Sequence, residues 1–474
     1  MYTSKEIKNI CCIGAGYVGG PTMAVLADKC PFLNIYVVDL NQEKIKQWNS
    51  KDTSELPIFE PGLEQIIKRV RGKNLFFSIN VDKYISIADM VFLSVNTPTK
   101  TKGVGSGQAS DLRWIEACAR QVAKSAKGHT IVVEKSTIPV KTAETIKIIL
   151  KSTEDSDDSN LKSFSILSNP EFLAEGTAIN DLENPDRILI GGEDEESMNH
   201  LSKIYEQWVA PTKIIKTNLW SSELSKLIAN AFLAQRVSSI NSISALCEKT
   251  GADVNQVSSA IGADSRIGSK FLMAGPGFGG SCFKKDILNL VYLCNYFGLP
   301  EVANYWKNVI TINDWQQKRL SEIIVEKLFG NLTDKKIVIL GFSFKAKTND
   351  TRESPSIYIS RYLLEEGAHL IINDPKVNQK QVDNDLKDDQ FFVPTLNNKN
   401  SFGTWEFSNN LEAAFEKADA AVILTDWPEY KKINWKILFK KMRKPAWLFD
   451  TRSIVEEKVI KDIGINLWKL GSNC

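Results

Sequence analysis

A glycine-rich turn near the start of the chain constrains the fold more than any other feature. The segment IKNICCI reads as a short buried strand, and Gly14, Gly16 and Gly19 follow it in a G-x-G-x-x-G spacing. Asp39 stands 20 residues after Gly19, at the end of a second apolar segment. A strand, a glycine turn, a helix and an acidic residue in this register predict a βαβ unit of a parallel sheet.

The same turn predicts a binding site for a dinucleotide. Gly14 permits the tight turn, Gly16 lets a pyrophosphate approach the backbone, and Gly19 lets the helix pack closely on the strand. The helix N-terminus attracts the anion. Asp39 would accept hydrogen bonds from the adenosine ribose, and its charge would repel a 2′-phosphate. The sequence therefore predicts NAD rather than NADP as the cofactor.

The layout of the first half of the chain returns in the second half. In the first 150 residues strands alternate with helices, which is typical of a parallel sheet covered on both faces. A second α/β unit begins with a strand at 335–345, and its next strand, at 367–375, contains Asp374 where the first unit has Asp39. Later strands of this unit are expected at 418–427 and 445–453.

The middle of the chain is predicted to be helical. Residues 220–247 contain no glycine or proline and carry an apolar stripe at helical spacing. The expected fold class is α/β, with two doubly wound Rossmann-like domains joined by a central helical dimerisation domain that contains a long spine helix. The polar stretches 151–163 and 378–410 are expected to be surface loops. The expected domains are 1–215, which binds NAD, 216–325, which is helical, and 326–474.

Composition excludes several classes of protein. The 474 residues include 59 Lys and Arg against 57 Asp and Glu, so no global basic field attracts nucleic acid. No apolar run reaches the roughly 18 residues that a membrane helix needs. Eight cysteines without a CxxC pair predict reduced thiols and a cytoplasmic location. With only three histidines, no metal site is expected, and acid–base chemistry falls to Lys, Asp or Glu.

A second glycine-rich segment, GPGFGGSCFKKD at 275–286, predicts a reactive thiol. Glycines at this density indicate backbone wrapped closely around a ligand. Cys282 is expected at the start of a helix with Lys284 and Lys285 nearby, an environment that favours the nucleophilic thiolate. Asp286, four residues on, shares a helical face with Cys282. The cysteines expected to be buried apolar residues are Cys11, Cys12, Cys30, Cys118, Cys247 and Cys294.

Three other groups of polar residues carry no assignment by spacing alone. Lys226 and Asn230 form an i,i+4 pair on the long helix, a spacing typical of a solvated surface. Glu171 and Glu175 form another, and glutamates at a helix start merely complement its dipole. The third is the strand end 134–137, whose hydroxyl groups could position water or a cofactor.

Taken together, these motifs resemble those of the UDP-glucose 6-dehydrogenases, within the UDP-glucose/GDP-mannose dehydrogenase family and nearest its animal and plant branch. The resemblance spans about residues 8–452. It implies a C-terminal domain that binds the UDP-sugar and an oxidation of UDP-glucose to UDP-glucuronate, for polysaccharide or glycosaminoglycan synthesis. The matching segments are GAGYVGGPT, NLFFS, VNTPTK, EKSTIPV, SNPEFLAEGTA, NPDRILIGG, WSSELSKLIANAFLAQR, GFGGSCFKKD and NDTRES.

The resemblance also implies roles for individual residues. Cys282 would be the nucleophile, with Lys226, Asn230 and Asp286 around the sugar C6. Glu171 would assist thioester hydrolysis, and Thr137 with Asp286 would hold a water. NAD would be bound by Gly14, Gly16, Tyr17, Val18, Gly19, Asp39, Lys44, Val95, Asn96, Thr97, Pro98, Thr99, Ser136, Glu175, Lys285 and Arg352. The substrate would be bound by Glu171, Phe172, Leu173, Lys226, Asn230, Arg266, Phe278, Gly279, Phe344, Lys345 and Arg452.

The resemblance further implies a homo-oligomer, because Arg266 matches a residue that the family reaches across from a neighbouring subunit. A hexamer built from dimers is expected, with a dimer as the alternative. Three other functions are compatible with parts of the pattern: a two-electron dehydrogenase of the β-hydroxyacid type, a dehydrogenase of another nucleotide sugar, and a non-enzymatic nucleotide-sugar sensor. Cys282 argues against the two-electron enzyme, and Cys282, Lys226 and Asp286 together argue against the sensor.

Overall fold

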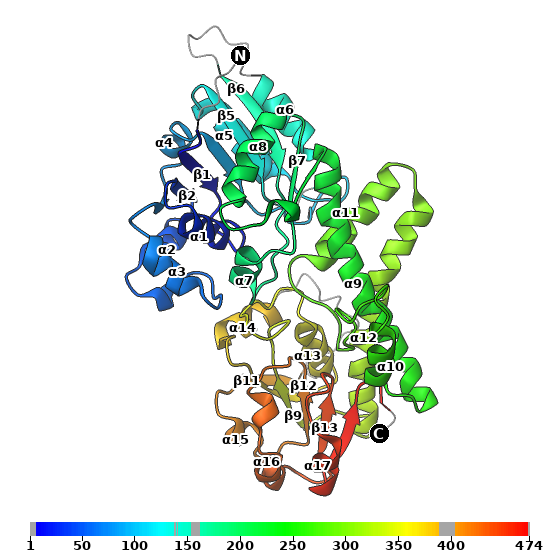
Figure 1. The fold of residues 1–474 in the computed structure, drawn as a ribbon. Coiled ribbons are helices and arrows are strands. Elements are labelled where there is room, and N and C mark those ends of the chain that lie inside the picture. The colour runs from blue at the N-terminus through cyan, green and yellow to red at the C-terminus, as the bar shows by residue number, and fades with distance from the viewer. Residues whose placement is uncertain (1–5, 137–138, 140, 153–161, 388–402, 473–474) are drawn as a thin grey trace. The chain divides into compact units, whose positions relative to one another are not determined.

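The chain divides into two compact units. The computed structural model describes residues 6–136, 139, 141–152, 162–387 and 403–472 (Figure 1). Unit 1 comprises Met1–Ala229 and Leu288–Phe297, and unit 2 comprises Asn230–Ile287 and Gly298–Cys474. Most of the loop expected at 151–163 lies outside the described residues.

Unit 1 is built on a sheet that, within the described residues, has eight strands in the order β3-β2-β1-β4-β5-β6-β7-β8. Neighbours pair in parallel except β6 and β7, which are antiparallel. The parallel sheet predicted for the first 150 residues is confirmed. The reversal lies beyond them, and strand patterns do not predict it, because alternation has the same period in both strand directions. The strands are β1 (Asn9–Ile13), β2 (Asn34–Val38), β3 (Leu75–Ser78), β4 (Met90–Leu93), β5 (His129–Glu134), β6 (Ser163–Ser168), β7 (Ile188–Gly192) and β8 (Ile214–Thr217).

Helices cover both faces of this sheet, as expected for a doubly wound domain. Cys12 belongs to the core that contains residues of α1, α3, α7 and α8, whereas its neighbour Cys11 belongs to the core with α4, α5 and α6. Successive side chains of a strand point to opposite faces, so β1 is buried on both sides. The helices are α1 (Gly19–Lys29), α2 (Gln42–Asn49), α3 (Leu63–Val70), α4 (Val81–Ile85), α5 (Arg113–Ser125), α6 (Thr142–Lys151), α7 (Ala178–Glu183) and α8 (Glu195–Tyr205).

The predicted long helix is present as α9 (Leu219–Thr250), which is coloured green in Figure 1. Its residues up to Ala229 belong to unit 1 and those from Asn230 to unit 2. The other helices of this region are α10 (Val254–Gly262), α11 (Phe283–Tyr296) and α12 (Pro300–Lys327). In the part of the chain that the structure describes, no helix is both long and apolar enough to cross a membrane.

Unit 2 contains a parallel sheet with, among the described residues, six strands in the order β11-β10-β9-β12-β13-β14. The predicted loop 378–410 is wrong in part, because it contains α14 (Gln379–Lys387) and β11 (Thr404–Phe407), which pairs with β10 at the sheet edge. Its polar composition concealed both. The other elements are β9 (Lys336–Leu340), α13 (Pro355–Glu365), β10 (His369–Asn373), α15 (Leu411–Ala414), β12 (Ala420–Ile423), α16 (Trp435–Lys441), β13 (Trp447–Asp450), α17 (Glu457–Asp462) and β14 (Asn466–Lys469).

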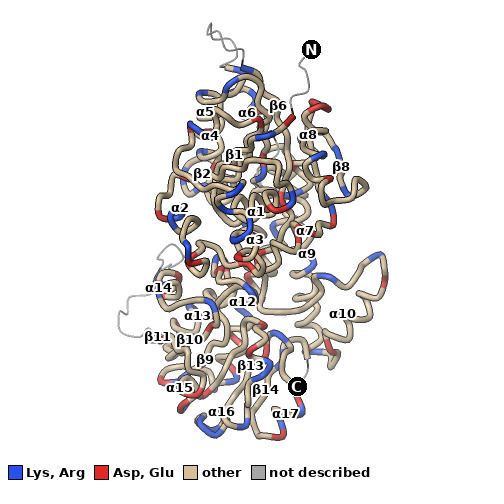
Figure 2. Tube along the Cα trace, turned by 60° about the vertical axis from the view of Figure 1, so that its left-hand side comes forward, with Lys and Arg blue, Asp and Glu red and all other residues tan. Residues whose placement is uncertain are grey.

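Charged residues of both signs are interspersed along the chain. Figure 2 shows basic and acidic segments alternating in both units. This distribution agrees with the near balance of 59 basic and 57 acidic residues.

Candidate functional site

The glycine turn after β1 has the geometry that a pyrophosphate needs. Gly14 has a φ of +111°, and a Cβ there would lie 2.5 Å from the carbonyl oxygen of Ser94. At Gly19 a Cβ would lie 2.0 Å from the carbonyl oxygen of Gly14, so the start of α1 packs directly on the turn. At Gly16, by contrast, no described atom lies within 4 Å of a Cβ position. Backbone open on one side, at a helix N-terminus, fits a bound pyrophosphate.

Asp39 closes this turn after β2. Its carboxylate accepts hydrogen bonds from the backbone N–H of Ala15 at 3.1 Å and of Asn41 at 2.9 Å, and from Lys44 Nζ at 2.9 Å. Burial alone would raise the pKa of Asp39, but these donors together lower it. A carboxylate offers about four lone-pair sites, so capacity remains for a ribose hydroxyl. Tyr17 and Val18, in the turn itself, are half-buried.

The next predicted cofactor residues follow β4 and β5, which are neighbours in the sheet. Val95, Asn96, Thr97, Pro98 and Thr99 come directly after β4, at the carboxyl edge that also carries the glycine turn. The Ser136 hydroxyl donates to the carbonyl oxygen of Val95 at 2.6 Å, which ties the two strand ends together. Thr137 lies outside the described residues.

Glu171 follows β6 and is held in place by a buried lysine that the sequence analysis did not single out. Lys135 Nζ lies 2.9 Å from the Glu171 carboxylate and also donates to Asn169 and Tyr205. Burial alone would lower the pKa of Lys135, but the Glu171 charge and Tyr205 raise it to about 12. A lysine at the end of an apolar strand was the available signal, because an unpaired ammonium would not be stable there.

Phe172 lies between two cations. The guanidinium of Arg187 lies 3.8 Å from its ring centroid, and Lys226 Nζ lies 5.2 Å from it. Lys226 is only 7% exposed, so it is not the solvated lysine that helical spacing alone would favour. Leu173 packs against the core of unit 1, and Glu175 is half-buried.

The thiol site lies where α11 begins, as predicted. Cys282 directly precedes α11, and its carbonyl oxygen accepts a hydrogen bond from the Asp286 N–H at 2.9 Å. Asn230 Nδ2 donates to the Asp286 carboxylate at 2.6 Å, and Lys285 Nζ lies 3.9 Å from it. Among the described cysteines Cys282 alone is exposed, and the six expected to be buried are buried. The structure therefore brings Cys282, Asp286 and Asn230 together.

The glycine-rich loop before Cys282 packs on the loop that follows β9. A Cβ at Gly279 would lie 2.5 Å from the carbonyl oxygen of Glu353 and 2.8 Å from Phe344 Cβ, so only glycine fits. Gly280 donates its N–H to the carbonyl oxygen of Arg352 at 2.8 Å. Lys284 Nζ lies 2.9 Å from the Glu353 carboxylate, so its charge is paired with Glu353. The sequence predicts that the Lys284 ammonium favours the Cys282 thiolate, whereas the structure directs this ammonium to Glu353.

The remaining predicted substrate residues of unit 2 lie around this loop, with one exception. Arg452 lies beside Gly275, where a Cβ would be 2.9 Å from its guanidinium, and its NH2 group is 3.5 Å from the Phe344 carbonyl oxygen. Lys345 Nζ lies 5.4 Å from the Phe344 ring centroid. Phe278 is buried, and its backbone N–H donates to the Asn313 side-chain oxygen at 2.7 Å. The exception is Arg266, which is exposed and paired with Asp264.

Arg352 and the other predicted residues divide between the two units. The Arg352 guanidinium forms an ion pair with Asp350 at 2.6 Å. Unit 1 contains Gly14, Gly16, Tyr17, Val18, Gly19, Asp39, Lys44, Val95, Asn96, Thr97, Pro98, Thr99, Ser136, Glu171, Phe172, Leu173, Glu175 and Lys226. Unit 2 contains Asn230, Arg266, Phe278, Gly279, Cys282, Lys285, Asp286, Phe344, Lys345, Arg352 and Arg452.

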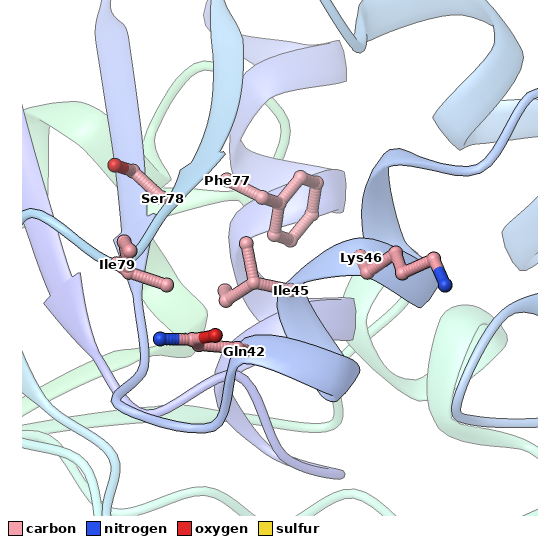
Figure 3. Close-up of a pocket in the computed structure, with 6 residues that line it drawn as sticks. All are labelled: Gln42, Ile45, Lys46, Phe77, Ser78 and Ile79. Carbon is pink, nitrogen blue, oxygen red and sulfur yellow. The ribbon is translucent and has the colours of Figure 1, made fainter.

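A surface pocket of about 380 Å³ lies beside the end of β3 (Figure 3). None of the predicted site residues lines it, although α2, which contributes to it, begins just after Asp39. Its lining residues are Gln42, Ile45, Lys46, Phe77, Ser78 and Ile79. Across the described ranges, no cluster of three or more His, Cys, Asp or Glu side chains could hold a metal ion.

Comparison with known proteins agrees with this geometry. Three models of the UDP-glucose/GDP-mannose dehydrogenase family match the chain: the NAD binding domain at residues 8–209, the central domain at 220–315 and the UDP binding domain at 338–457. UDP-glucose 6-dehydrogenase of Bos taurus is 53% identical, over 98% of this chain and 93% of its own. UDP-glucose 6-dehydrogenase 4 of Arabidopsis thaliana is 52% identical, over 98% and 96%.

Comparison with solved structures finds the same family. The solved structure of a UDP-glucose dehydrogenase from Pyrobaculum islandicum matches with a TM-score of 0.83 at 27% identity, over 99% of both chains. The glycine turn and Asp39 lie within the NAD binding domain of the family, so NAD is the cofactor that this unit binds. The chain belongs to the UDP-glucose/GDP-mannose dehydrogenase family.

Proposed function

We propose that this protein oxidises UDP-glucose to UDP-glucuronate, using two molecules of NAD and one of water. Relatives that are 51–53% identical over nearly the whole chain and are named UDP-glucose 6-dehydrogenase support the substrate. The observation that carries the four-electron reaction is Cys282, an exposed thiol next to the Asp286–Asn230 pair. A two-electron alcohol oxidation does not require a nucleophilic thiol.

The first oxidation needs only a proton acceptor and a charge that steadies the developing alkoxide. The C6 hydroxyl loses its proton while a hydride leaves C6, which yields the aldehyde. Bound NAD supplies the hydride acceptor. The Lys226 ammonium is buried over Phe172, where a cation interacts strongly with a developing oxyanion. Lys226 and the Asp286–Asn230 pair are the candidates for guiding the proton away.

The second oxidation uses the thiol. An aldehyde is a poor hydride donor, but attack by Cys282 Sγ forms a C–S bond and a tetrahedral thiohemiacetal. Loss of a second hydride from this adduct gives a thioester. Water then attacks the thioester carbonyl, the C–S bond breaks, and UDP-glucuronate and the free thiol are released. Atoms and electrons balance with two hydrides accepted and one water consumed.

Hydrolysis of the thioester needs a positioned water and a base. The Asp286 carboxylate accepts from Asn230 at 2.6 Å and retains lone pairs that can accept from a water. Glu171 is held by Lys135 and by the backbone N–H groups of Phe172 and Leu173, at 2.8 and 3.1 Å. We assign Asp286, with Thr137, to the water and Glu171 to the assisting carboxylate.

We also propose that the protein assembles as a homo-oligomer, a hexamer built from dimers, with a dimer as the alternative. The helices α9 to α12 carry many large exposed apolar side chains, which are typical of surfaces that bind another protein. The exposed Arg266 would serve a neighbouring subunit. Mass measurement by light scattering tests this proposal, and a monomer in solution would contradict it. The large exposed apolar residues of these four helices are Trp220, Leu224, Phe232, Ile243, Leu246, Ile261, Tyr296, Val302, Tyr305 and Trp315.

The test of the reaction is the amount of NADH formed from limiting UDP-glucose with excess NAD. Two NADH per sugar support the four-electron reaction. One NADH per sugar indicates an aldehyde product and a two-electron enzyme, and would overturn the role of Cys282. If no NADH forms with UDP-glucose, the same assay with GDP-mannose and UDP-N-acetylmannosamine identifies another sugar, and failure with all of them leaves a sensor.

A further inference from the structure

Two buried carboxyl groups outside the predicted site meet inside unit 1. Glu134 is the last residue of β5, and Glu223 lies in the first turns of α9. They are 1% and 2% exposed, and their carboxyl groups are hydrogen-bonded to one another. The reaction proposed above uses neither residue. Two carboxylates cannot both be charged at such a contact, so their protonation states are linked.

The hydrogen bonds around the pair identify which group is charged. Glu223 accepts the backbone N–H of Lys141 at one oxygen, at 2.8 Å, and that of Ala143 at the other, at 2.9 Å. In the described part of the chain, no backbone or side-chain N–H and no hydroxyl donates to either carboxyl oxygen of Glu134. Charged acceptors gain most from backbone N–H donors. Glu223 is therefore the carboxylate, and Glu134 is the carboxylic acid that donates to it.

The charges that face the pair do not favour a second ionisation. Lys135, next to Glu134, directs its ammonium to Glu171. Lys141 donates only its backbone N–H, while its ammonium lies 5.9 Å from the ring centroid of Trp220. Glu144, on the exposed side of α6, adds a like charge. Burial raises the pKa of both acids, that of Glu223 to about 7, although its two backbone donors oppose the shift.

The pair lies between segments that carry predicted site residues. Ser136 and Thr137 lie between Glu134 and the Lys141 N–H, and Lys226 follows Glu223 by three residues on α9. Glu223 thus joins the start of α6 to α9, and Glu134 joins the end of β5 to the same point. If the shared proton is lost, two charges repel at the point where these three elements meet.

We propose that Glu134 and Glu223 form a proton-sharing positioning pair, which fastens the end of β5 and the start of α6 to α9 and releases them when the proton is lost. Their effect on turnover rests on the proposed function, whereas the shared proton itself does not. The folded state binds a proton that the unfolded chain, with ordinary glutamates, gives up at about pH 4.3. Stability from this proton is therefore full at low pH and is lost as the pH rises through the folded-state value.

The first test compares melting temperatures of the full-length protein without ligands at pH values from 6 to 9. Glu134→Gln replaces the acid with an amide that still donates to Glu223 but cannot titrate. We expect the decline of the melting temperature with rising pH to be shallower in this variant, so that it melts above the wild type at pH 9. Glu223→Gln should melt lower at every pH, because its amide group can accept only one of the two backbone donors and turns its NH2 toward the other.

Glu144→Gln is the matched control, since it removes a neighbouring like charge but keeps both acids. Its melting temperature should still decline as steeply with rising pH as that of the wild type, with the decline beginning at a lower pH. A wild-type decline in Glu134→Gln would overturn the proposal. Infrared spectroscopy provides a measurement on the wild type itself: we expect the C=O band of a protonated carboxylic acid at pH 7, and a weakening of this band as the pH rises further. Absence of that band at pH 7 would equally overturn the proposal.

The pH profile of kcat/KM for NAD then separates positioning from packing. Loss of the proton should lower kcat/KM on the alkaline side in the wild type and in Glu144→Gln, and this decline should move to higher pH in Glu134→Gln. An unchanged profile would contradict the positioning role. If UDP-glucose yields no NADH while the melting and infrared results are as expected, the proposed function fails and the proton-sharing pair stands.

Discussion

The two sheets contain the same glycine turn followed by an aspartate, but the aspartate is half-buried in unit 1 and fully buried in unit 2. Gly14 and Gly341 follow the first strand of each sheet, both with positive φ, and both are packed too closely for a side chain, against Ser94 and Thr425 respectively. An aspartate after the second strand then binds backbone N–H groups of the turn in each case. Asp39 does so in unit 1, where it remains half-buried.

In unit 2 the Asp374 carboxylate is buried and is occupied by hydrogen bonds from the protein itself. One of its oxygens accepts from the N–H groups of Phe342 and Ser343, at 2.7 and 3.1 Å, and from Trp427 Nε1 at 3.1 Å. It is 2% exposed. The comparison teaches that this carboxylate first stabilises the turn and becomes a ligand-binding group only where the fold leaves it accessible. The glycine at the position of Gly16 is likewise absent from unit 2, where the turn continues as Gly-Phe-Ser-Phe.

The largest expected effect separates the tasks of the two units. Cys282→Ser should lower the formation of UDP-glucuronate at least about a thousandfold, as loss of a catalytic nucleophile does, while NAD binding to unit 1 persists. Turnover is measured as NADH per sugar, and binding by calorimetry. Cys294→Ser, which changes a buried thiol on α11, is the control and should retain turnover. Full turnover by Cys282→Ser would exclude the covalent step.

Asp374→Ala should have the next largest effect, on stability. It leaves buried donors of Phe342, Ser343 and Trp427 without their acceptor, which costs about 3 kcal/mol of the free energy of unfolding. Urea unfolding measures the loss, and Asp374→Asn, which keeps one acceptor oxygen, should lose less. A loss confined to NAD affinity, with unchanged stability, would mean that the two aspartates do not differ as described.

Asp39→Ala should have a smaller effect, and on the affinity for NAD rather than on stability. We expect the KM for NAD to rise about tenfold to a hundredfold, since roughly 1.4 kcal/mol corresponds to each factor of ten, with a smaller loss of stability than in Asp374→Ala. Initial rates at varied NAD and at varied UDP-glucose give the two constants. Equal losses for both ligands would contradict the assignment of Asp39 to the cofactor.

The smallest effect is on acid stability. The pKa of Asp39 is lowered in the folded protein, so its carboxylate contributes stability that is present above the ordinary value of about 3.9 and is lost as the pH falls through the folded-state value. Asp39→Asn removes this contribution, so the stability of the variant should fall less steeply with decreasing pH than that of the wild type, as followed by circular dichroism. An identical acid transition in both proteins would show that the donors around Asp39 do not favour its charged form.

Local patterns made much of the fold and part of the site predictable. The glycine turn, the alternation of strands and helices and the long helix α9 follow from spacings of at most some 30 residues, and the structure confirms them. The position of Cys282 before α11 was predictable for the same reason. Thr137 stays a prediction, because it lies outside the described residues.

Contacts between distant segments were not predictable from these patterns. Asn230 meets Asp286 across 56 residues of chain, and Glu134 meets Glu223 across an even longer separation. Spacing also suggested that Lys226 is exposed, whereas burial of a lysine depends on what packs over its helix. The direction of β7 and the presence of the strand β11 were not predictable for a related reason, since the pairing of strands is a property of the assembled sheet.

Among the described cysteines one thiol is exposed and six are buried, so they should react with a thiol reagent at different rates. Of the described cysteines, Cys282 should react quickly, with one equivalent of a thiol-alkylating reagent. Bound UDP-glucose should slow that first phase. The buried thiols react only when their surroundings open, so the slow phases report local unfolding. Cys11 and Cys12 would report the opening of opposite faces of the first sheet, which a single peptide map of the labelled protein could distinguish.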